Sequence, residues 1–191
     1  MNILVQNAAG KCLMRPDTSI NRENGDYYVP DDVDAVGWSP ALFARISKAG
    51  KAVQPGFAAR YYDSFAFGVL LHPSCETRDG KAHYCKACAA IYDNSTVIPY
   101  PLCSAETLDD TDKSFYVAKD GKEVYLCNME GLRGRLEQAI AKCSSHSSVR
   151  IGDMVAVELA GVQDLVLRDS ASCSLEARFD SSKIIDIKII F

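Results

Sequence analysis

The chain has 191 residues, of which 48% are apolar and 24% charged, and its formal net charge is −4 at pH 7. This length suits one hydrophobic core, so we expect a single domain over residues 1–191. The net negative charge and the lack of a run of lysines or arginines argue against a nucleic-acid-binding protein, which needs a basic surface. The N-terminal MNILVQNAAG lacks the pattern of an export signal, and no stretch approaches about eighteen apolar residues, so we expect a cytoplasmic protein with no membrane contact.

Taken in chain order, two-residue alternation and short apolar runs predict strands along most of the sequence. A short helix is expected from Pro55, because proline lacks only an N–H that has no partner in a first helical turn. A second helix is expected over 129–143, where apolar residues recur at helical spacing, and Asp120-Gly121 predicts a type I′ hairpin. The expected strands, including those of the hairpin, cover 3–5, 27–30, 42–47, 65–71, 115–119, 124–126, 151–159, 162–168, 174–179 and 184–191. These elements predict a mainly β fold with a few short helices, of the α+β class.

The last predicted strand, 184–191, carries apolar residues on both faces at its ends. A bare strand of this composition would invite aggregation. We therefore expect it to be covered or paired, and a contact between the two chains of a homodimer is one way to achieve this.

Residues 37–73 resemble the central segment of the fumarylacetoacetate hydrolase family, which has a tyrosine, a Glu-x-Glu pair on a strand, a turn, a short helix and Gly-Tyr-x-x-x-Asn-Asp. Trp38 stands at the tyrosine position, Ser39 and Ala41 where the two glutamates occur, and Leu70 where the aspartate occurs. In that family, the resemblance implies, these carboxylates hold a magnesium or calcium ion, which requires oxygen ligands. One hydroxyl and two alkyl groups cannot reproduce that site, so we expect no cofactor.

Other family positions are also replaced. Ala90 stands where the family has a lysine near the substrate, and residues 158–160 do not reproduce Gly-Thr-Pro-x-Gly, whose threonine helps to bind substrate. Arg15, Asp93 and Asp153 occupy matched polar positions, but each also has a structural interpretation. Asp93 and Asp153 can cap turns, and Arg15 can be a surface cation.

The resemblance spans roughly residues 13–160 and implies a mixed β-sheet roll like the family's C-terminal catalytic domain, assembled as a homodimer. It also implies a C–C hydrolase, isomerase or decarboxylase activity on 2-oxo or β-diketo acids. Because scaffold positions match while charged ones do not, we interpret the chain as a degenerate member of the family without that metal-dependent activity. It would then act as a binding or structural module, with a small organic acid as its possible ligand and no catalytic residue assigned. A non-catalytic partner of an active paralogue fits equally, and whether the chain is an enzyme stays open.

The alternative function depends on the cysteines, of which the chain has eight. Cys85 and Cys88 form a CxxC motif with Cys75 and His83 nearby, and thiolates with imidazole are the ligands that zinc prefers. An enzyme or zinc protein with a site rebuilt around this cluster is therefore conceivable, as is a cysteine nucleophile paired with His72 or His83. The plain alternative is that the cysteines are small, partly buried residues on a helix or strand.

Overall fold

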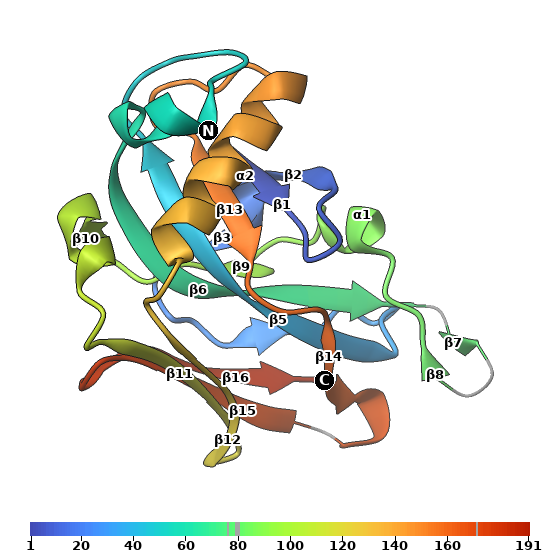
Figure 1. The fold of residues 1–191 in the computed structure, drawn as a ribbon. Coiled ribbons are helices and arrows are strands. Elements are labelled where there is room, and N and C mark those ends of the chain that lie inside the picture. The colour runs from blue at the N-terminus through green and yellow to red at the C-terminus, as the bar shows by residue number, and fades with distance from the viewer. Residues whose placement is uncertain (76, 79–80, 171) are drawn as a thin grey trace.

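Strands dominate the computed structural model, which describes residues 1–75, 77–78, 81–170 and 172–191 (Figure 1). The strands are β1 (Asn2–Gln6), β2 (Cys12–Pro16), β3 (Ile20–Asn21), β4 (Tyr27–Tyr28), β5 (Ala35–Ile46), β6 (Tyr62–Ser74), β7 (Thr77–Arg78), β8 (Lys81–Ala82), β9 (Thr96–Val97), β10 (Cys103–Ser104), β11 (Ser114–Lys119), β12 (Lys122–Asn128), β13 (Met154–Glu158), β14 (Gln163–Leu167), β15 (Ser172–Phe179) and β16 (Ser182–Ile190). The helices are α1 (Lys86–Ala89) and α2 (Leu132–His146), with short 3₁₀ helices η1 (Asp17–Ser19), η2 (Pro55–Arg60), η3 (Ala105–Asp109) and η4 (Arg168–Ser170). The expected mainly β, α+β class is confirmed.

The larger sheet is mixed and runs β2-β1-β13-β5-β6-β9-β3, with β10 on β6 and β14 on β5. Its β1–β13 and β3–β9 pairs are parallel, and its other pairs are antiparallel. The long antiparallel pair of β5 and β6 forms its centre, in a register that sets Ser39 opposite Leu70 and Gly37 opposite His72. This pair therefore supplies most of the positions to which the sequence analysis assigned chemistry.

Two details of β5 differ from expectation. The strand has both faces buried, since Phe43 is as inaccessible as Leu42, whereas the alternation predicted one buried face. It also begins at Ala35, seven residues earlier than expected, and includes Pro40, a residue that normally argues against a central strand. Along one edge of β5, strand β14 pairs with the residues before Pro40 and strand β13 with the residues after it. Pro40 lies at the change between these two strands, so its missing N–H removes no hydrogen bond of either ladder.

The smaller sheet runs β12-β11-β15-β16-β4 and packs below the larger one in Figure 1. The predicted hairpin is present as β11 and β12, and both turn residues, Asp120 and Gly121, have the positive φ angles that a type I′ turn requires. The C-terminal strand β16 pairs with β15 on one edge and with β4 on the other. The expectation that it is paired is confirmed, and its partners belong to the same chain.

Two hydrophobic clusters stabilise this arrangement. The main core lies between the sheets and includes an aromatic group in which Phe67 stacks on Phe115 at 4.5 Å between ring centroids. The second cluster lies on the other face of β5 and β6 and includes Ala41, Phe43 and Leu70, packed with side chains from β1 and β13. This second cluster fills the side of the sheet that carries the candidate site.

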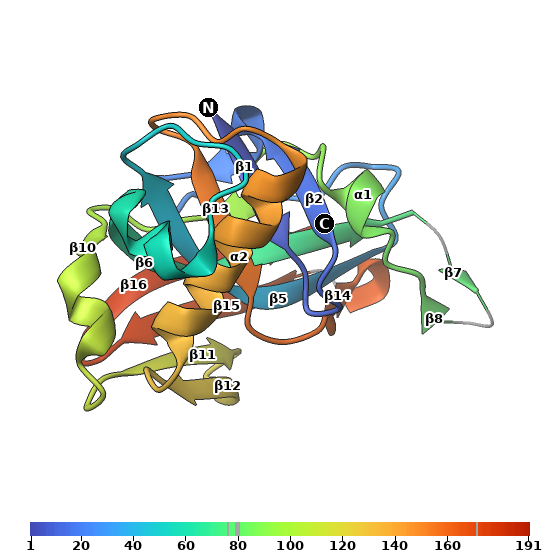
Figure 2. The same cartoon turned by 45° about the horizontal axis from the view of Figure 1, so that its top comes forward.

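Helix α2 packs across β1 and β13 (Figure 2). It begins after Gly131, whose positive φ ends the preceding turn, and it buries the predicted apolar stripe, including Leu136 and Ile140. Burying a leucine or isoleucine side chain contributes about 1.5–3 kcal/mol, so this stripe anchors the helix. In the described part of the chain, no helix combines the length and apolar character needed to cross a membrane.

Candidate functional site

The positions matched to the family's metal ligands lie together on one face of the larger sheet. Ser39 and Ala41 alternate on β5, and Leu70 on β6 pairs directly with Ser39. All three side chains are fully buried, and both Ala41 and Leu70 belong to the second hydrophobic cluster. Two of these three positions therefore contribute to core packing.

Beside that cluster, the same region holds five polar side chains that we call the buried polar cluster, namely Arg15, Ser39, His72, Lys86 and Glu158. They come from β2, β5, β6, α1 and the end of β13. Lys86 is 20% exposed, and the other four are at most 1% exposed. Burying ionised groups is costly unless they are paired and hydrogen-bonded, so a cluster of this kind requires an explanation.

Arg15 is held entirely within the protein, so its interpretation as a surface cation is wrong. Its Nη1 donates to Ser95 O at 3.0 Å and to Ser95 Oγ and Thr96 Oγ1 at 3.1 Å, and its Nη2 donates to Leu71 O at 2.9 Å. Burial lowers its pKa to about 10, and the negative charge of Glu158 opposes that shift. The guanidinium is therefore charged at neutral pH, and its terminal nitrogens already have acceptors.

Two contacts set the proton position on the His72 imidazole. Nδ1 faces the Arg15 Nη2 at 3.5 Å, and because arginine only donates, Nδ1 must carry a lone pair. The proton of the neutral ring is then on Nε2, which lies 2.9 Å from Ser39 Oγ and 3.8 Å from Glu158 Oε1. Burial, followed by the charges of Arg15 and Lys86, lowers the pKa of His72 well below its usual value. Nε2–H thus donates to Ser39, and His72 is not arranged as a base for the serine hydroxyl.

Glu158 is the one carboxylate of the cluster and is fully buried. Its Oε2 accepts a hydrogen bond from the Ala8 backbone N–H at 3.0 Å and pairs with the Lys86 ammonium. Its Oε1 has no hydrogen-bond partner. Among the described residues, Tyr27 Oη is the one other buried side-chain polar atom that lacks a partner. With His72 neutral, the cations Arg15 and Lys86 outnumber Glu158, which leaves the cluster with one excess positive charge and one unused acceptor.

The cysteine cluster has a different location. Cys75 is exposed just after β6, Cys85 immediately precedes α1, Cys88 lies on α1 at the surface, and His83 is exposed. Over the ranges that the structure describes, no group of three or more His, Cys, Asp or Glu side chains could hold a metal ion. The assignment of these four residues stays a prediction.

Sequence reasoning missed most of the buried polar cluster. Glu158 was noted only within a stretch that departs from a motif, His72 only as a candidate partner of a cysteine nucleophile, and Lys86 was not singled out. A charged residue that ends a run of buried apolar residues, as Glu158 ends β13, was the available signal. The interpretation of Asp153 as a turn cap holds, since its Oδ2 accepts the Arg150 backbone N–H at 2.9 Å.

No protein-family model matches the sequence, and no curated protein matches it significantly. Solved structures do match. Fumarylpyruvate hydrolase from Pseudomonas aeruginosa, solved with Mn²⁺ and pyruvate, superposes with a TM-score of 0.77 at 14% identity, covering 100% of this chain and 90% of that one. Maleylpyruvate hydrolase from Sphingobium sp. SYK-6, also with manganese and pyruvate, gives 0.72 at 15% identity, covering 97% and 69%. A protein from Yersinia pestis CO92, provisionally assigned to the fumarylacetoacetate hydrolase family, gives 0.74 at 16% identity, covering 99% and 92%.

These structures correct one expectation. We expected no cofactor, with magnesium or calcium as the family's ions and zinc as the alternative, whereas two similar structures hold manganese together with pyruvate. The expectation of no cofactor is therefore wrong for this fold. The residues matched to the ligand positions do not fit such an ion, however, because Ser39 offers one neutral oxygen and Ala41 and Leu70 offer none.

The agreement covers nearly the whole of this chain. At 14–16% identity, such a likeness establishes architecture. The chain has the fold of the fumarylacetoacetate hydrolase family.

Proposed function

We propose that this chain is a binding module for a small organic acid that carries a hydroxyl or enol group, rather than a metal-dependent hydrolase or decarboxylase of 2-oxo or β-diketo acids. The observation that carries the proposal is the buried polar cluster, in which two cations accompany one carboxylate and Glu158 Oε1 has no hydrogen-bond donor. A ligand that completes this cluster has to bring one negative charge and one donor. A small hydroxy acid, or the enol of a 2-oxo acid, supplies both.

Each group of the cluster then has a defined role. The ligand carboxylate pairs with Lys86, the cluster member that reaches the surface, while the ligand hydroxyl donates to Glu158 Oε1. Arg15 acts through its charge, since its terminal nitrogens already donate within the chain. Ser39 and His72 fix the polar wall beside Glu158.

The comparisons support the choice of ligand class. Fumarylpyruvate hydrolase and maleylpyruvate hydrolase, which share this fold, were solved with pyruvate, a small 2-oxo acid. The loss of the cleavage chemistry is inferred from replaced positions. Ala41 and Leu70 cannot coordinate a metal ion, and Ala90 cannot act as the family's lysine.

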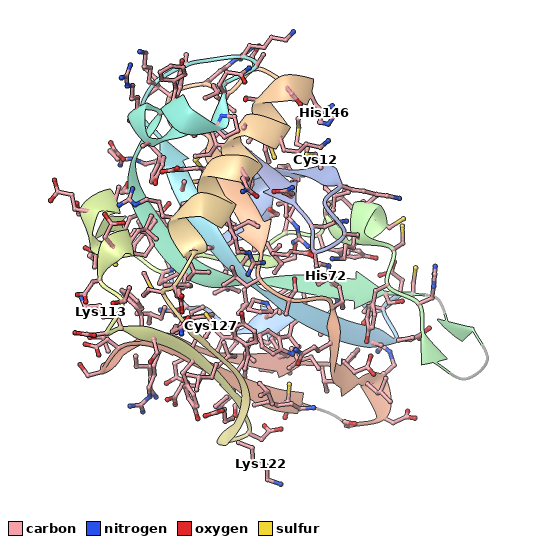
Figure 3. All side chains as sticks on the ribbon, viewed as in Figure 1. Cys12, His72, Lys113, Lys122, Cys127 and His146 are labelled. Carbon is pink, nitrogen blue, oxygen red and sulfur yellow. The ribbon has the colours of Figure 1, made fainter. Side chains whose placement is uncertain are left out.

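The test is calorimetric titration of the purified protein with malate, lactate, pyruvate and, as an uncharged control, lactamide. We expect at least one of the acids to bind and lactamide not to bind. Lys86→Met, which keeps an apolar stem and removes the charge, should weaken binding at least tenfold, about 1.4 kcal/mol. Lys122→Met, at an exposed lysine of the β11–β12 hairpin far from His72 in Figure 3, should bind like the parent protein.

Two results would contradict the proposal. One is that no acid binds, or that Lys86→Met binds as well as the parent. The other is hydrolysis of acylpyruvates or decarboxylation of oxaloacetate by the purified protein that is abolished by EDTA and restored by manganese.

We propose in addition that the chain forms a homodimer and acts in the cytoplasm. The dimer is supported by the exposed, apolar side chains of Tyr28 and Ile91, which line one surface cavity. Cell fractionation with an antibody against the chain tests the location, and recovery in a membrane or secreted fraction would contradict it.

A further inference from the structure

Two cysteines that are 131 residues apart in sequence meet where helix α2 crosses the N-terminal hairpin. Cys12 is the first residue of β2, and Cys143 lies on the buried stripe of α2. Their sulfur atoms are 3.7 Å apart, with the Cys143 thiol donating to the Cys12 sulfur (Cys12 is labelled beside α2 in Figure 3). A disulfide bond is about 2.05 Å long, so the two sulfur atoms have to approach by roughly 1.7 Å to form one.

The packing of three elements brings these thiols together. β1 pairs with β2 in a register that sets Gln6 opposite Cys12, and α2 packs on β1. Cys143 is 1% exposed, whereas Cys12 is half-buried. An oxidant from solution therefore reaches Cys12 first. Burial, followed by the neighbouring Cys12, raises the pKa of Cys143, which leaves that residue as a protonated thiol.

We infer that Cys12 and Cys143 form a disulfide when the folded protein meets a peroxide. In the first step the Cys12 sulfur attacks one peroxide oxygen, the O–O bond breaks, and Cys12 becomes a sulfenic acid as one water leaves. In the second step the Cys143 sulfur attacks the Cys12 sulfur, the S–OH bond breaks, and the hydroxyl leaves as a second water with the Cys143 proton. The two thiols lose two electrons and two protons, and one peroxide is reduced to two waters.

The bond would join α2 to the hairpin that supports the buried polar cluster. Arg15 lies on β2, and Ala8, which donates to Glu158, lies in the turn between β1 and β2. A cross-link between residues so distant in sequence removes many conformations from the unfolded chain. The oxidised protein should therefore be more stable, with its hairpin held against the helix.

The experiment uses the full chain, reduced with dithiothreitol, desalted and treated with one equivalent of hydrogen peroxide. Remaining thiols are blocked with N-ethylmaleimide before digestion and mass spectrometry. We expect a peptide pair joined through Cys12 and Cys143 that is two hydrogens lighter than the separate peptides and is released by dithiothreitol. The oxidised protein should also unfold at a higher temperature than the reduced protein.

Matched variants distinguish a specific Cys12–Cys143 disulfide from non-specific oxidation of other cysteines. Cys12→Ser, at a half-buried position, should fold, lose the joined peptide and lose the thermal shift, while Cys173→Ser, at another buried cysteine, should retain both. The inference is overturned if the folded protein is oxidised at the exposed Cys75 with no Cys12–Cys143 peptide. It is also overturned if that peptide forms no more readily in the folded protein than in protein oxidised in denaturant.

Discussion

At the scale of single residues, Arg15 determines the state of the imidazole beside it. Because the guanidinium faces Nδ1, the proton of the neutral ring is on Nε2 and is donated to Ser39. The arrangement looks like a serine–histidine pair when distances alone are considered, yet the proton lies on the wrong nitrogen for general-base catalysis. Because of Arg15, the Ser39 hydroxyl accepts a hydrogen bond from His72 and has no base at this position to remove its proton.

The depressed pKa of His72 predicts how stability depends on pH. In the unfolded chain this imidazole takes up a proton as the pH falls below 6.5, whereas in the folded protein burial and two nearby cations keep it neutral. The unfolded state therefore binds more protons, and the free energy of unfolding falls by up to about 1.4 kcal/mol per pH unit below pH 6.5. Urea unfolding between pH 7.5 and 5 should show that slope.

The control for this prediction is a second histidine. His72→Gln, which keeps a donor toward Ser39, should flatten the slope between pH 6.5 and 5, and His146→Gln, at the exposed end of α2, should leave it unchanged. Equal slopes in the parent protein and in His72→Gln would show that His72 does not carry the effect.

Leu70 tests whether a family ligand position has become part of the core. It is fully buried in the second hydrophobic cluster, so Leu70→Ala should lower the free energy of unfolding by about 2–5 kcal/mol. Leu126→Ala, at a half-exposed position on β12, should change it by less than about 0.5 kcal/mol. Chemical denaturation of both variants measures the difference. A loss below about 1 kcal/mol at Leu70 would contradict the packing role.

At the scale of elements, two glycines are expected to respond in opposite directions to the same substitution. Gly121 has a φ of +75° in the hairpin turn, where alanine is strained, so Gly121→Ala should cost about 1 kcal/mol. Gly134 lies within α2 with open space around its Cα, so Gly134→Ala should stabilise by about 0.5–1 kcal/mol. Shifts of the thermal midpoint in the same direction for both variants would contradict this account.

The same elements mark the limits of prediction from the sequence. The hairpin and helix α2 depend on local signals, namely an Asp-Gly turn and an apolar stripe, and both were predicted. The full extent of β5 was not, because Pro40 is acceptable only through a change of neighbouring strand that no local pattern reveals. The buried polar cluster was missed for the same reason, since Lys86 and Glu158 are 72 residues apart and meet only through the fold.

At the scale of the whole molecule, the chain has the fold of the fumarylacetoacetate hydrolase family. The sheet face that carries the matched positions Ser39, Ala41 and Leu70 is divided between the second hydrophobic cluster and the buried polar cluster. No family model or curated protein matches the sequence, whereas the fold superposes on solved structures over nearly the whole chain. The architecture depends on patterns of burial and turns, which many sequences satisfy, so one fold can carry different sites.

The assembly of the molecule gives the last prediction. With β16 paired on both edges within the chain, an intermolecular sheet is not needed to cover it, so a dimer requires another surface. Tyr28 and Ile91 are 72% and 70% exposed and line one cavity of about 520 Å³ that Asp26, Asp32 and Asp93 also line, and we propose that a second copy buries the side chains of this patch. Light scattering after size exclusion should give about twice the 20.9 kDa mass of the chain.

Ile91→Glu should shift that mass to the monomer, because a carboxylate buried there loses its hydration and lies beside other carboxylates instead of a cation. Leu167→Glu, at an exposed position on β14 outside the patch, should remain dimeric. If the parent protein is monomeric at 100 micromolar, the homodimer is wrong. If both variants stay dimeric, the chain dimerises through a different surface, and the exposure of Tyr28 and Ile91 needs another explanation, such as contact with a different protein.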